Sequence, residues 1–331
     1  MPNSSKAFRL ATAMFLAGAC LFPPAYAHAD FGKDFPRKAV RLVVAGAAGS
    51  QQDLSARMIG QKLGESWRGP VVVDNRPGGG GILAARTVAQ AAPDGYTLLL
   101  TGASFVISAS QQSNLPYDPQ RNFSGIGQIG YATFVLVVAP ALGVKSVNDL
   151  IALAKAQPGK LIFGSTSAGG IGHLSGARFN LSAGIKVVTV AFKGPSEATI
   201  EVLTGRTHYS VLALGVAQPF LKDGKLLALA VLTPQRSPVL PDVPALAEML
   251  PDFRKPDTSQ GLVAPAGTPR PILNHINKEV ARTLNLPDIK ERLQVIGYIP
   301  APTTPEEYDK ILRAQIETLS RLIRDAGLRA Q

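Results

Sequence analysis

The residues best suited to binding chemistry lie in a loop at residues 46–50, with the sequence Gly-Ala-Ala-Gly-Ser. A β-branched apolar run at residues 39–45 precedes this loop, and apolar residues at helical spacing follow Asp53. This order predicts a buried parallel strand, a tight turn and the N-terminus of a helix. Such an N-terminus carries unpaired N–H groups and a dipole that favours an anion. The loop therefore predicts half of a small-anion site.

A second loop of the same kind occupies residues 165–173 and is rich in glycine and hydroxyl residues. It lies between a predicted strand at residues 161–164 and a predicted helix at residues 174–183. Where two such helix N-termini face each other, their N–H groups converge on one acid group. The second loop therefore predicts the other half of the anion site.

Enzymatic and metal chemistry find little support in the residue pattern. His173, His208 and His275 have neither histidine partners at i, i+4 nor nearby cysteines that would hold a metal. The glycine run at residues 78–81 lacks the Lys-Ser/Thr of a phosphate-binding loop, and no Gly-x-Ser-x-Gly elbow occurs. His173 beside a serine is an alternative as a base, but its place in the first turn of a helix favours a structural or ligand-contacting role. We therefore predict a protein that is not an enzyme and has no cofactor and no metal.

Predicted strands and helices alternate along the chain, which is typical of an α/β protein with right-handed crossovers. Ligands of such sheets bind at the carboxyl ends of strands, and Ser104 follows a predicted strand at residues 97–100. Ser146 is predicted to cap a helix at residues 147–156. Further strands are predicted at residues 70–73, 187–191, 209–212 and 226–232, and further helices at residues 82–91, 198–204, 270–284, 287–296 and 305–326.

The N-terminus has the pattern of a secretory signal peptide. Two basic residues precede an apolar run at residues 10–22, and small residues follow it. We predict that residues 1–29 are cleaved after Ala27 or Ala29 and that the mature chain lies in the periplasm. Cys20, the only cysteine of the chain, lies inside this segment, so a lipoprotein anchored through Cys20 is the alternative.

Length and charge set limits on the kind of partner. A chain of 331 residues with an ordinary globular composition suggests two domains. The formal net charge is +11, but the basic residues are scattered and are not interleaved with aromatic side chains. This pattern does not favour nucleic acid as a partner. A basic field favours anionic solutes instead.

Several ordered segments carry a family resemblance. They include Val-Asp-Asn-Arg-Pro-Gly-Gly-Gly-Gly at residues 73–81, Ala-Pro-Asp-Gly-Tyr-Thr-Leu at 92–98, Leu-Pro-Tyr-Asp-Pro at 115–119 and Ala-Pro-Ala-Gly-Thr-Pro at 264–269. In these segments the chain resembles the tripartite tricarboxylate transporter receptor family, the Bug/TctC-type periplasmic solute-binding proteins. The match runs in register from about residue 35 to the C-terminus.

The resemblance implies a two-lobed periplasmic binding protein of the Venus-flytrap type. Each lobe is expected to be an α/β unit, a mostly parallel sheet flanked by helices, and two crossing strands should join the lobes. Residues 30–131 and 257–331 would form lobe 1, and residues 132–256 would form lobe 2. The two lobes are expected to close around a small carboxylate.

The resemblance also places the ligand on the two loops, with departures from the family pattern. The family's Pro-Gly-Gly-Ser/Thr-x-Asp is replaced by Ala-Gly-Ser-Gln-Gln-Asp at residues 48–53, whose two glutamine amides can donate and accept. Lys193 is the one charged candidate near the cleft; contact with the ligand, a bridge between the lobes and neutralisation of Glu197 are open alternatives. The candidate ligand-binding residues are Gly49, Ser50, Gln51, Gln52, Asp53, Ser104, Ser167, Gly169, Gly170, Ile171, Gly172, His173 and Lys193.

Two further departures bear on the type of ligand. The hydroxyl residues often found before the histidine are replaced by Gly-Ile-Gly at residues 170–172, which keeps main-chain donors and loses side-chain donors. The family's Asp-Asn pair is replaced by Ala-Leu-Gly at residues 213–215, which leaves Asp53 as the remaining acceptor for an ammonium group. An amino-acid ligand is therefore less well supported than a mono- or dicarboxylate, with an apolar or aromatic body as an option.

These expectations together describe an extracytoplasmic solute receptor. It would act as a monomer that binds a small organic acid and delivers it to a membrane permease of the tripartite tricarboxylate type. One alternative is an exported sensor that presents the bound acid to a signalling partner. An exported enzyme acting on carboxylates is the other alternative.

Overall fold

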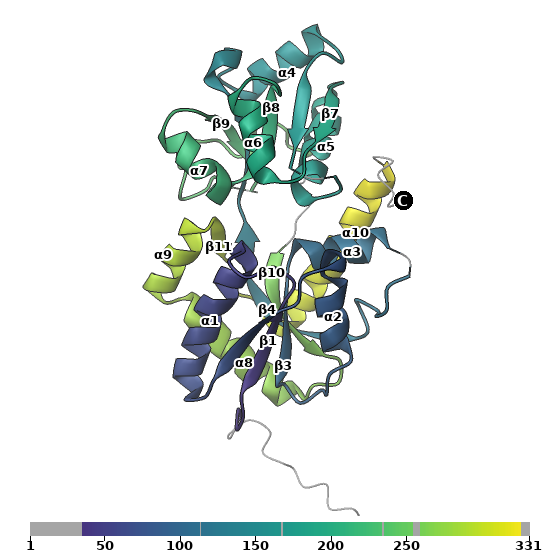
Figure 1. Ribbon diagram of the computed structural model, residues 1–331, viewed down its shortest axis with the longest axis vertical. Helices are drawn as coiled ribbons and strands as arrows, with labels where there is room; N and C mark the ends of the chain where they lie inside the picture. Colours follow the sequence, from purple (N-terminus) through teal and green to yellow (C-terminus); the bar gives the residue numbers. More distant parts are fainter. Residues whose placement is uncertain (1–34, 113, 167, 234, 254–258, 326–331) are drawn as a thin grey trace, which may run out of the picture.

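The chain folds into two lobes. The computed structural model describes residues 35–112, 114–166, 168–233, 235–253 and 259–325. The predicted signal peptide, with Cys20, lies outside these ranges. Figure 1 shows one lobe above the other, each a sheet with helices packed on it, which confirms the two-lobed α/β architecture. No helix in the described ranges is long and apolar enough to cross a membrane.

The first lobe is built on a sheet whose strands follow the order β11-β4-β10-β3-β1-β2. β1 pairs in parallel with β2 and β3, whereas β10 pairs antiparallel with β3 and β4, and β11 antiparallel with β4. The sheet is therefore mixed, where the resemblance led us to expect a mostly parallel one. The strands are β1 (Val40–Val44), β2 (Val71–Asn75), β3 (Thr97–Thr101), β4 (Phe123–Ala132), β10 (Ser259–Pro265) and β11 (Tyr298–Pro300).

The second lobe holds a sheet with the strand order β7-β6-β8-β5-β9. β6 is parallel to β7 and β8, and β5 is antiparallel to β8 and β9, so this sheet is mixed as well. The strand that enters this lobe from β4 thus runs against its neighbours. The strands are β5 (Phe134–Val138), β6 (Ile162–Ser165), β7 (Val188–Ala191), β8 (Tyr209–Ala213) and β9 (Leu227–Val231).

Helices cover both faces of each sheet. In the first lobe they are α1 (Gln51–Trp67), α2 (Ile82–Ala89), α3 (Ala103–Gln111), α8 (Arg270–Leu284), α9 (Pro287–Val295) and α10 (Pro305–Asp325). In the second lobe they are α4 (Val147–Ala156), α5 (Ile171–Ala183), α6 (Pro195–Leu203) and α7 (Leu214–Lys222). Short 3-10 helices are η1 (Gly79–Gly81), η2 (Pro140–Leu142) and η3 (Leu246–Glu248). The predicted helices at residues 147–156 and 270–284 are confirmed, and Ser146 caps α4 by accepting from the Asp149 N–H at 3.1 Å. β11, α3 and α7 were not predicted.

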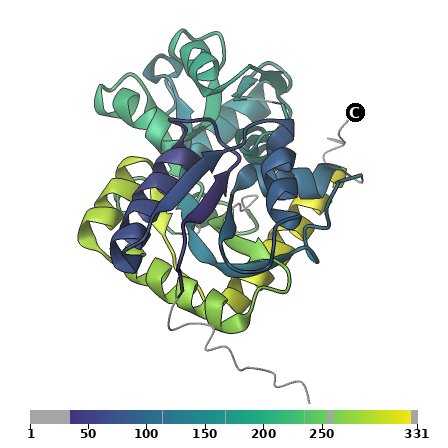
Figure 2. The ribbon, with the colours of Figure 1, turned by 60° about the horizontal axis from the view of Figure 1, so that its bottom comes forward.

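The apolar residues of β1, a strand interrupted only by the partly exposed Arg41, are buried because both faces of its sheet are covered. Leu42, 1% exposed, packs among residues of α1, α8 and α9, whereas Val43, 0% exposed, packs among residues of α2, α3 and α10. Figure 2 shows α1 and α8 on one side of the strands and α2 and α10 on the other. A strand covered on both faces carries apolar residues at its buried positions on either side.

One residue carries the first crossing between the lobes. β4 ends at Ala132 and β5 begins at Phe134, so only Thr133 lies between the two sheets. Its N–H donates to the Gly297 carbonyl of the first lobe at 3.0 Å, and its carbonyl accepts from the Leu214 N–H of the second lobe at 2.8 Å. The main chain of Thr133 is therefore hydrogen-bonded to both lobes. The second crossing lies between Phe253 and Ser259, where residues 254–258 are outside the described ranges.

Candidate functional site

The first predicted loop connects β1 to α1 and is held by a buried carboxylate. Asp53, 2% exposed, accepts from the Gly49 N–H at 2.8 Å and from Arg57 Nε at 3.0 Å through Oδ2, and from Asn75 Nδ2 at 2.9 Å through Oδ1. Burial alone would raise the pKa of Asp53, but the hydrogen bonds from Arg57, Gly49 and Asn75 outweigh it and hold the pKa below its ordinary value. Both oxygens are engaged within the protein, so Asp53 shapes the loop and is not a free acceptor for a ligand ammonium.

The state of Asp53 predicts a pH dependence of stability. A carboxyl whose folded pKa is lowered stabilises the fold above its unfolded pKa, near 3.8, and this contribution is lost as the pH falls through the lower folded value. Asp53→Asn should lower the free energy of unfolding at pH 7 by about 1.5–3 kcal/mol, the range for hydrogen bonds to a charged group. Urea unfolding at pH 7 and at about pH 3 measures this difference, which should shrink at the lower pH. An equal loss at both pH values would contradict it.

Ser50, Gln51 and Gln52 surround the start of α1. Ser50 is its N-cap, and its Oγ accepts from the Asp53 N–H at 3.3 Å. The Gln51 amide donates to the Ile296 carbonyl, and Gln52 Nε2 donates to the Leu100 carbonyl at 2.9 Å. Both amide nitrogens therefore brace α1 against neighbouring elements. Each amide nitrogen keeps a second N–H, so the use of these side chains as ligand donors, expected from the sequence, stays a prediction.

Main-chain donors remain free at this helix start. The first helical bond of α1 runs from the Leu54 N–H to the Ser50 carbonyl at 2.9 Å. No hydrogen bond within the described part of the chain uses the N–H groups of Gln51 or Gln52. Figure 1 shows this end of α1 pointing toward the second lobe. The unused donors of the first loop are thus backbone N–H groups.

Ser104 lies close to the first loop. It is in the first turn of α3, where a Cβ added to Gly81 would be 2.9 Å from Ser104 Oγ and 3.3 Å from the Ala45 Cβ. Ala45 follows β1, and α3 follows β3, so the ends of two adjacent parallel strands bring these residues together. Their position agrees with the rule that ligands meet the carboxyl ends of parallel strands.

The second loop leads into α5 three residues earlier than the sequence suggested. α5 begins at Ile171 with Gly170 as its N-cap, and Gly169 has φ +68°. The first helical bond joins the Leu174 N–H to the Gly170 carbonyl at 2.9 Å. The N–H groups of Ile171 and of the next two residues, Gly172 and His173, have no partner in the described part of the chain. Ser167 lies outside the described residues.

Gly172 and His173 lie in the first turn of α5. A Cβ added to Gly172 would be 2.7 Å from Thr166 Oγ1 and 3.0 Å from the Val211 carbonyl, so only glycine allows this approach to β8. Burial lowers the pKa of His173, and its Nδ1 has no partner among the described residues. A lowered pKa favours the neutral imidazole at pH 7.

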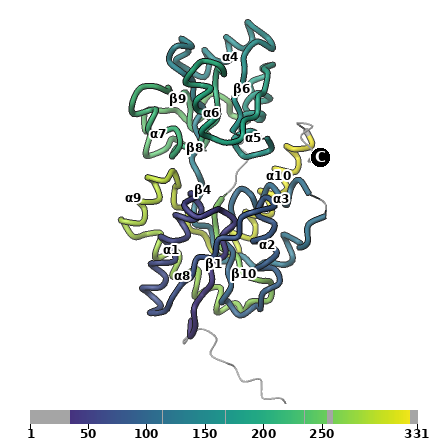
Figure 3. Tube along the Cα trace, viewed as in Figure 1, coloured from purple at the N-terminus to yellow at the C-terminus, as the bar shows by residue number. Residues whose placement is uncertain are grey.

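The two lobes touch on both sides of the α1 N-terminus. On one side, a Cβ added to Gly169 would be 3.0 Å from Gln111 Nε2, at the end of α3. On the other side, a Cβ added to Gly297 would be 3.0 Å from the Gly215 N and 3.5 Å from Gln51 Nε2. Figure 3 shows these approaches as α5 above α3 and α7 above α9. The starts of α1 and α5 thus lie at the boundary between the lobes.

Lys193 follows β7 at the same end of the second sheet. Its N–H donates to Glu197 Oε2 at 3.0 Å, and its exposed ammonium forms no ion pair with a described residue. This bond comes from the backbone and not from the ammonium, so the three alternatives for the Lys193 side chain stay open. The ammonium group remains available to a solute or a partner.

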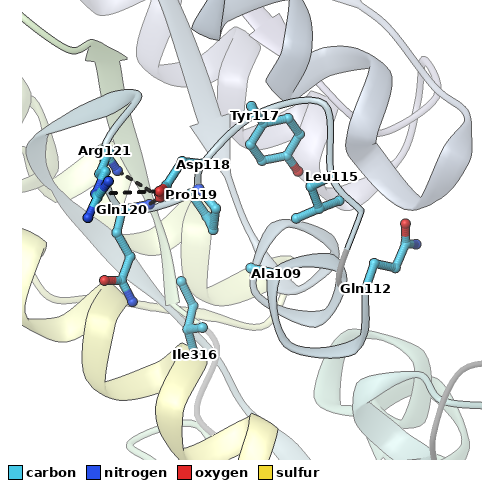
Figure 4. A pocket seen from close by; sticks show the side chains of 9 residues that line it. All are labelled: Ala109, Gln112, Leu115, Tyr117, Asp118, Pro119, Gln120, Arg121 and Ile316. Atoms are coloured by element: carbon cyan, nitrogen blue, oxygen red, sulfur yellow. Dashed lines mark hydrogen bonds and ion pairs between the residues drawn. The ribbon is translucent and has the colours of Figure 1, made fainter.

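A hollow in the first lobe lies apart from these loops (Figure 4). It has a volume of about 560 Å³ beside α3 and α10, and Leu115, Tyr117 and Ile316 contribute to its walls. The Asp118 carboxylate there accepts from the N–H groups of Gln120 and Arg121 at 2.8 and 3.0 Å, so it fixes its own turn. We do not place the ligand in this hollow.

Comparison with known proteins decides the family. The tripartite tricarboxylate transporter family receptor, TctC, matches residues 55–328. The chain belongs to this receptor family. A UPF0065 protein of Bordetella bronchiseptica is 30% identical over 296 residues, which are 89% of this chain and 88% of that protein.

Solved structures of similar proteins share the fold of this receptor. The R. palustris protein Rpa4515, solved with adipate, is 31% identical with a TM-score of 0.76 and covers 89% of this chain and 99% of its own. MatC from Rhodopseudomonas palustris, solved with malate, is 27% identical with a TM-score of 0.69 and covers 87% of this chain and all of its own. The likeness therefore extends over both lobes.

The residue pattern alone did not reveal the residues that hold the first loop of this receptor. Arg57 lies at i+4 from Asp53, a spacing that signals an ion pair on a helix. Asn75 ends β2, next to β1 in the sheet, so adjacent parallel strands bring their carboxyl ends together. Gln111, which reaches toward Gly169 of the other lobe, has no local signal because only the tertiary fold places it there.

Proposed function

We propose that this receptor binds a small carboxylate between its lobes and delivers it to a membrane permease of the tripartite tricarboxylate type. Residues 1–29 would direct export to the periplasm, where the mature chain would act as a monomer without a cofactor or catalytic activity. We take residues 30–131 with 257–331 as lobe 1 and residues 132–256 as lobe 2.

The observation that carries this proposal is the pair of helix N-termini with unused N–H groups. Two donors come from Gln51 and Gln52 at the start of α1, and others come from Ile171 and the residues after it at the start of α5. An acid that touches both lobes would favour their closed arrangement. The adipate and malate of the two similar structures support an organic acid as the ligand class.

The free energies of these hydrogen bonds are large enough for micromolar binding of a carboxylate. A hydrogen bond from an N–H to a carboxylate contributes about 1.5–3 kcal/mol, and a helix terminus adds about 0.3–1 kcal/mol. Three or four such donors leave a micromolar dissociation constant, about −8 kcal/mol, within reach after the costs of ordering. Because the Asp53 oxygens are engaged, a ligand without an ammonium group fits best. We therefore favour a mono- or dicarboxylate.

A thermal-shift screen of small organic acids, including adipate and malate, tests the proposal. A ligand at 100 times its dissociation constant should stabilise the protein by about 2.7 kcal/mol. We expect acids to raise the melting temperature and the matching neutral amides to leave it unchanged. Absence of any shift across the acids, or equal shifts with the amides, would contradict a carboxylate site.

A further inference from the structure

The outer edge of the second lobe is an unprotected strand. β7 comes first in the strand order and pairs only with β6 within the described sheet. All of its residues are exposed, with Val188 at 46% and Val190 at 37%. The strand carries no charged residue and no proline, the features that usually protect an edge from pairing with another chain. Figure 1 shows β7 at the margin of the lobe beside α5.

The free edge of β7 presents main-chain groups to solvent. The N–H groups of Val188 and Phe192 point inward and donate to the Leu161 and Ser165 carbonyls at 2.9 and 3.0 Å. Alternate residues of a strand direct their N–H and C=O groups to opposite sides. Those of Thr189 and Ala191 therefore point away from β6, and no described residue bonds to them. They can pair with one more strand.

A groove runs between this strand and α5. It has a volume of about 520 Å³, and its walls are mainly apolar. Thr189 and Ala191 line it from the strand, and Ala177 and Leu181, the latter 53% exposed, line it from the helix. Side chains of an added strand alternate between two faces, so every second one would enter this groove.

Charge indicates what the edge would accept. Lys186 precedes β7 and Lys193 follows it, and neither ammonium has an ion-pair partner among the described residues. Glu197, the nearest acid along the chain, bonds to the Lys193 N–H. Antiparallel pairing of two copies of β7 would bring Lys186 of one copy toward Lys193 of the other. Like charges placed opposite each other are destabilising, so the two lysines favour an acidic partner over a second copy.

We propose that the edge of β7 and the α5–β7 groove dock an extended acidic segment of a partner protein, which adds a strand to the second sheet. Backbone groups of the segment pair with Thr189 and Ala191. Its small apolar side chains enter the groove, and its acidic residues meet Lys186 and Lys193. The groove reaches His173 in the first turn of α5, and Lys193 is also a candidate for the carboxylate site. Lys186 and Thr189 are not candidates for that site, so variants at these two residues let each proposal fail without the other.

Peptide selection with a backbone scan tests the docking surface. A phage library of random ten-residue peptides is panned against the purified protein, and enriched peptides are made with a fluorescent label. We expect enrichment of acidic sequences with alternating apolar residues. Methylation of each peptide nitrogen in turn should weaken binding at every second position, because only alternate N–H groups of an added strand face β7.

Protein variants locate the bound peptide. Lys186→Glu should lower the affinity for the peptide about two- to fivefold, the effect expected for loss of a surface ion pair. Lys290→Glu, the same charge change on an exposed lysine of α9, should leave it unchanged. Thr189→Pro, which removes an outward N–H, should abolish binding, and circular dichroism checks that the variant folds. Lys186→Glu and the peptide scan keep the test valid if Thr189→Pro does not fold.

Several outcomes would overturn the docking surface. They are no enrichment, enrichment of basic peptides, and a methylation scan without the alternating pattern. Light scattering provides a further check. If the protein forms a dimer and Thr189→Pro converts it to a monomer, the edge of β7 serves self-association. The proposal of an acidic partner strand would then be wrong.

Discussion

Gln51→Pro should weaken binding of the carboxylate about 10- to 100-fold while the protein stays folded. Gln51 is the first residue of α1, a position where proline is tolerated. A proline there removes one N–H that the ligand would need. Ser50 has φ −67° and ψ 158°, the extended conformation that a residue before proline prefers. Loss of one hydrogen bond to a charged group costs about 1.5–3 kcal/mol, which gives this change in the dissociation constant.

Gln51→Ala is the matched control for this variant. Both variants lose the side-chain bond to the Ile296 carbonyl, but only alanine keeps the backbone N–H. Isothermal titration with the strongest acid from the thermal-shift screen should therefore separate the two. Ile171→Pro and Ile171→Ala make the same comparison at the start of α5, where Gly170 has φ −73° and ψ 167°. Equal affinities of the proline and alanine variants at both helices would rule out the backbone site.

Gly130→Ala should lower the free energy of unfolding by about 3 kcal/mol and weaken ligand binding as well. A Cβ at Gly130 would overlap the backbone oxygen of Ile299, so β11 would have to move away from β4. β11 continues from Ile296 and Gly297, which receive bonds from the Gln51 amide and from the Thr133 N–H. A shift of β11 would therefore disturb the start of α1 and the first crossing together.

Gly69→Ala is the control for this substitution. The nearest atom to a Cβ at Gly69 is the Trp67 carbonyl oxygen at 3.8 Å, an ordinary contact. Urea unfolding and titration of the ligand should show changes in Gly130→Ala and almost none in Gly69→Ala. A Gly130→Ala protein with unchanged stability would show that β11 does not constrain β4.

Local signals explain which elements could be predicted from the sequence. α4 matched to the residue because Ser146 is a strong N-cap and bonds the Asp149 N–H. α5 was expected too late because its N-cap, Gly170, has no side chain to mark a helix start. α3 was missed for the same reason, since Gly102 is its N-cap and no side chain caps it.

Features that depend on distant parts of the chain could not be predicted. The direction of β10 follows from the return of the chain from the second lobe, which makes both its pairings antiparallel. The sequence presented Asp53 as a free acceptor, whereas Asn75 and Arg57 engage it in the folded protein. The two loops were predicted in position, because glycine-rich turns after apolar strands are local patterns, although α5 begins three residues earlier than expected. Their role in ligand binding stays a prediction.

The bonds at Thr133 have a mechanical consequence. Thr133 is bonded to one residue of each lobe. A rotation that opens the lobes and keeps both bonds must have its axis close to Thr133. Atoms near such a pivot hardly move, and displacement grows with distance from it. Gly297 is a partner of Thr133, and Gly215 follows Leu214, the other partner. The contact between Gly297 and Gly215 would therefore persist, while Gly169 and Gln111 would move apart the most. The lobes would open by a hinge motion, with the entrance to the cleft on the side of α3 and α5.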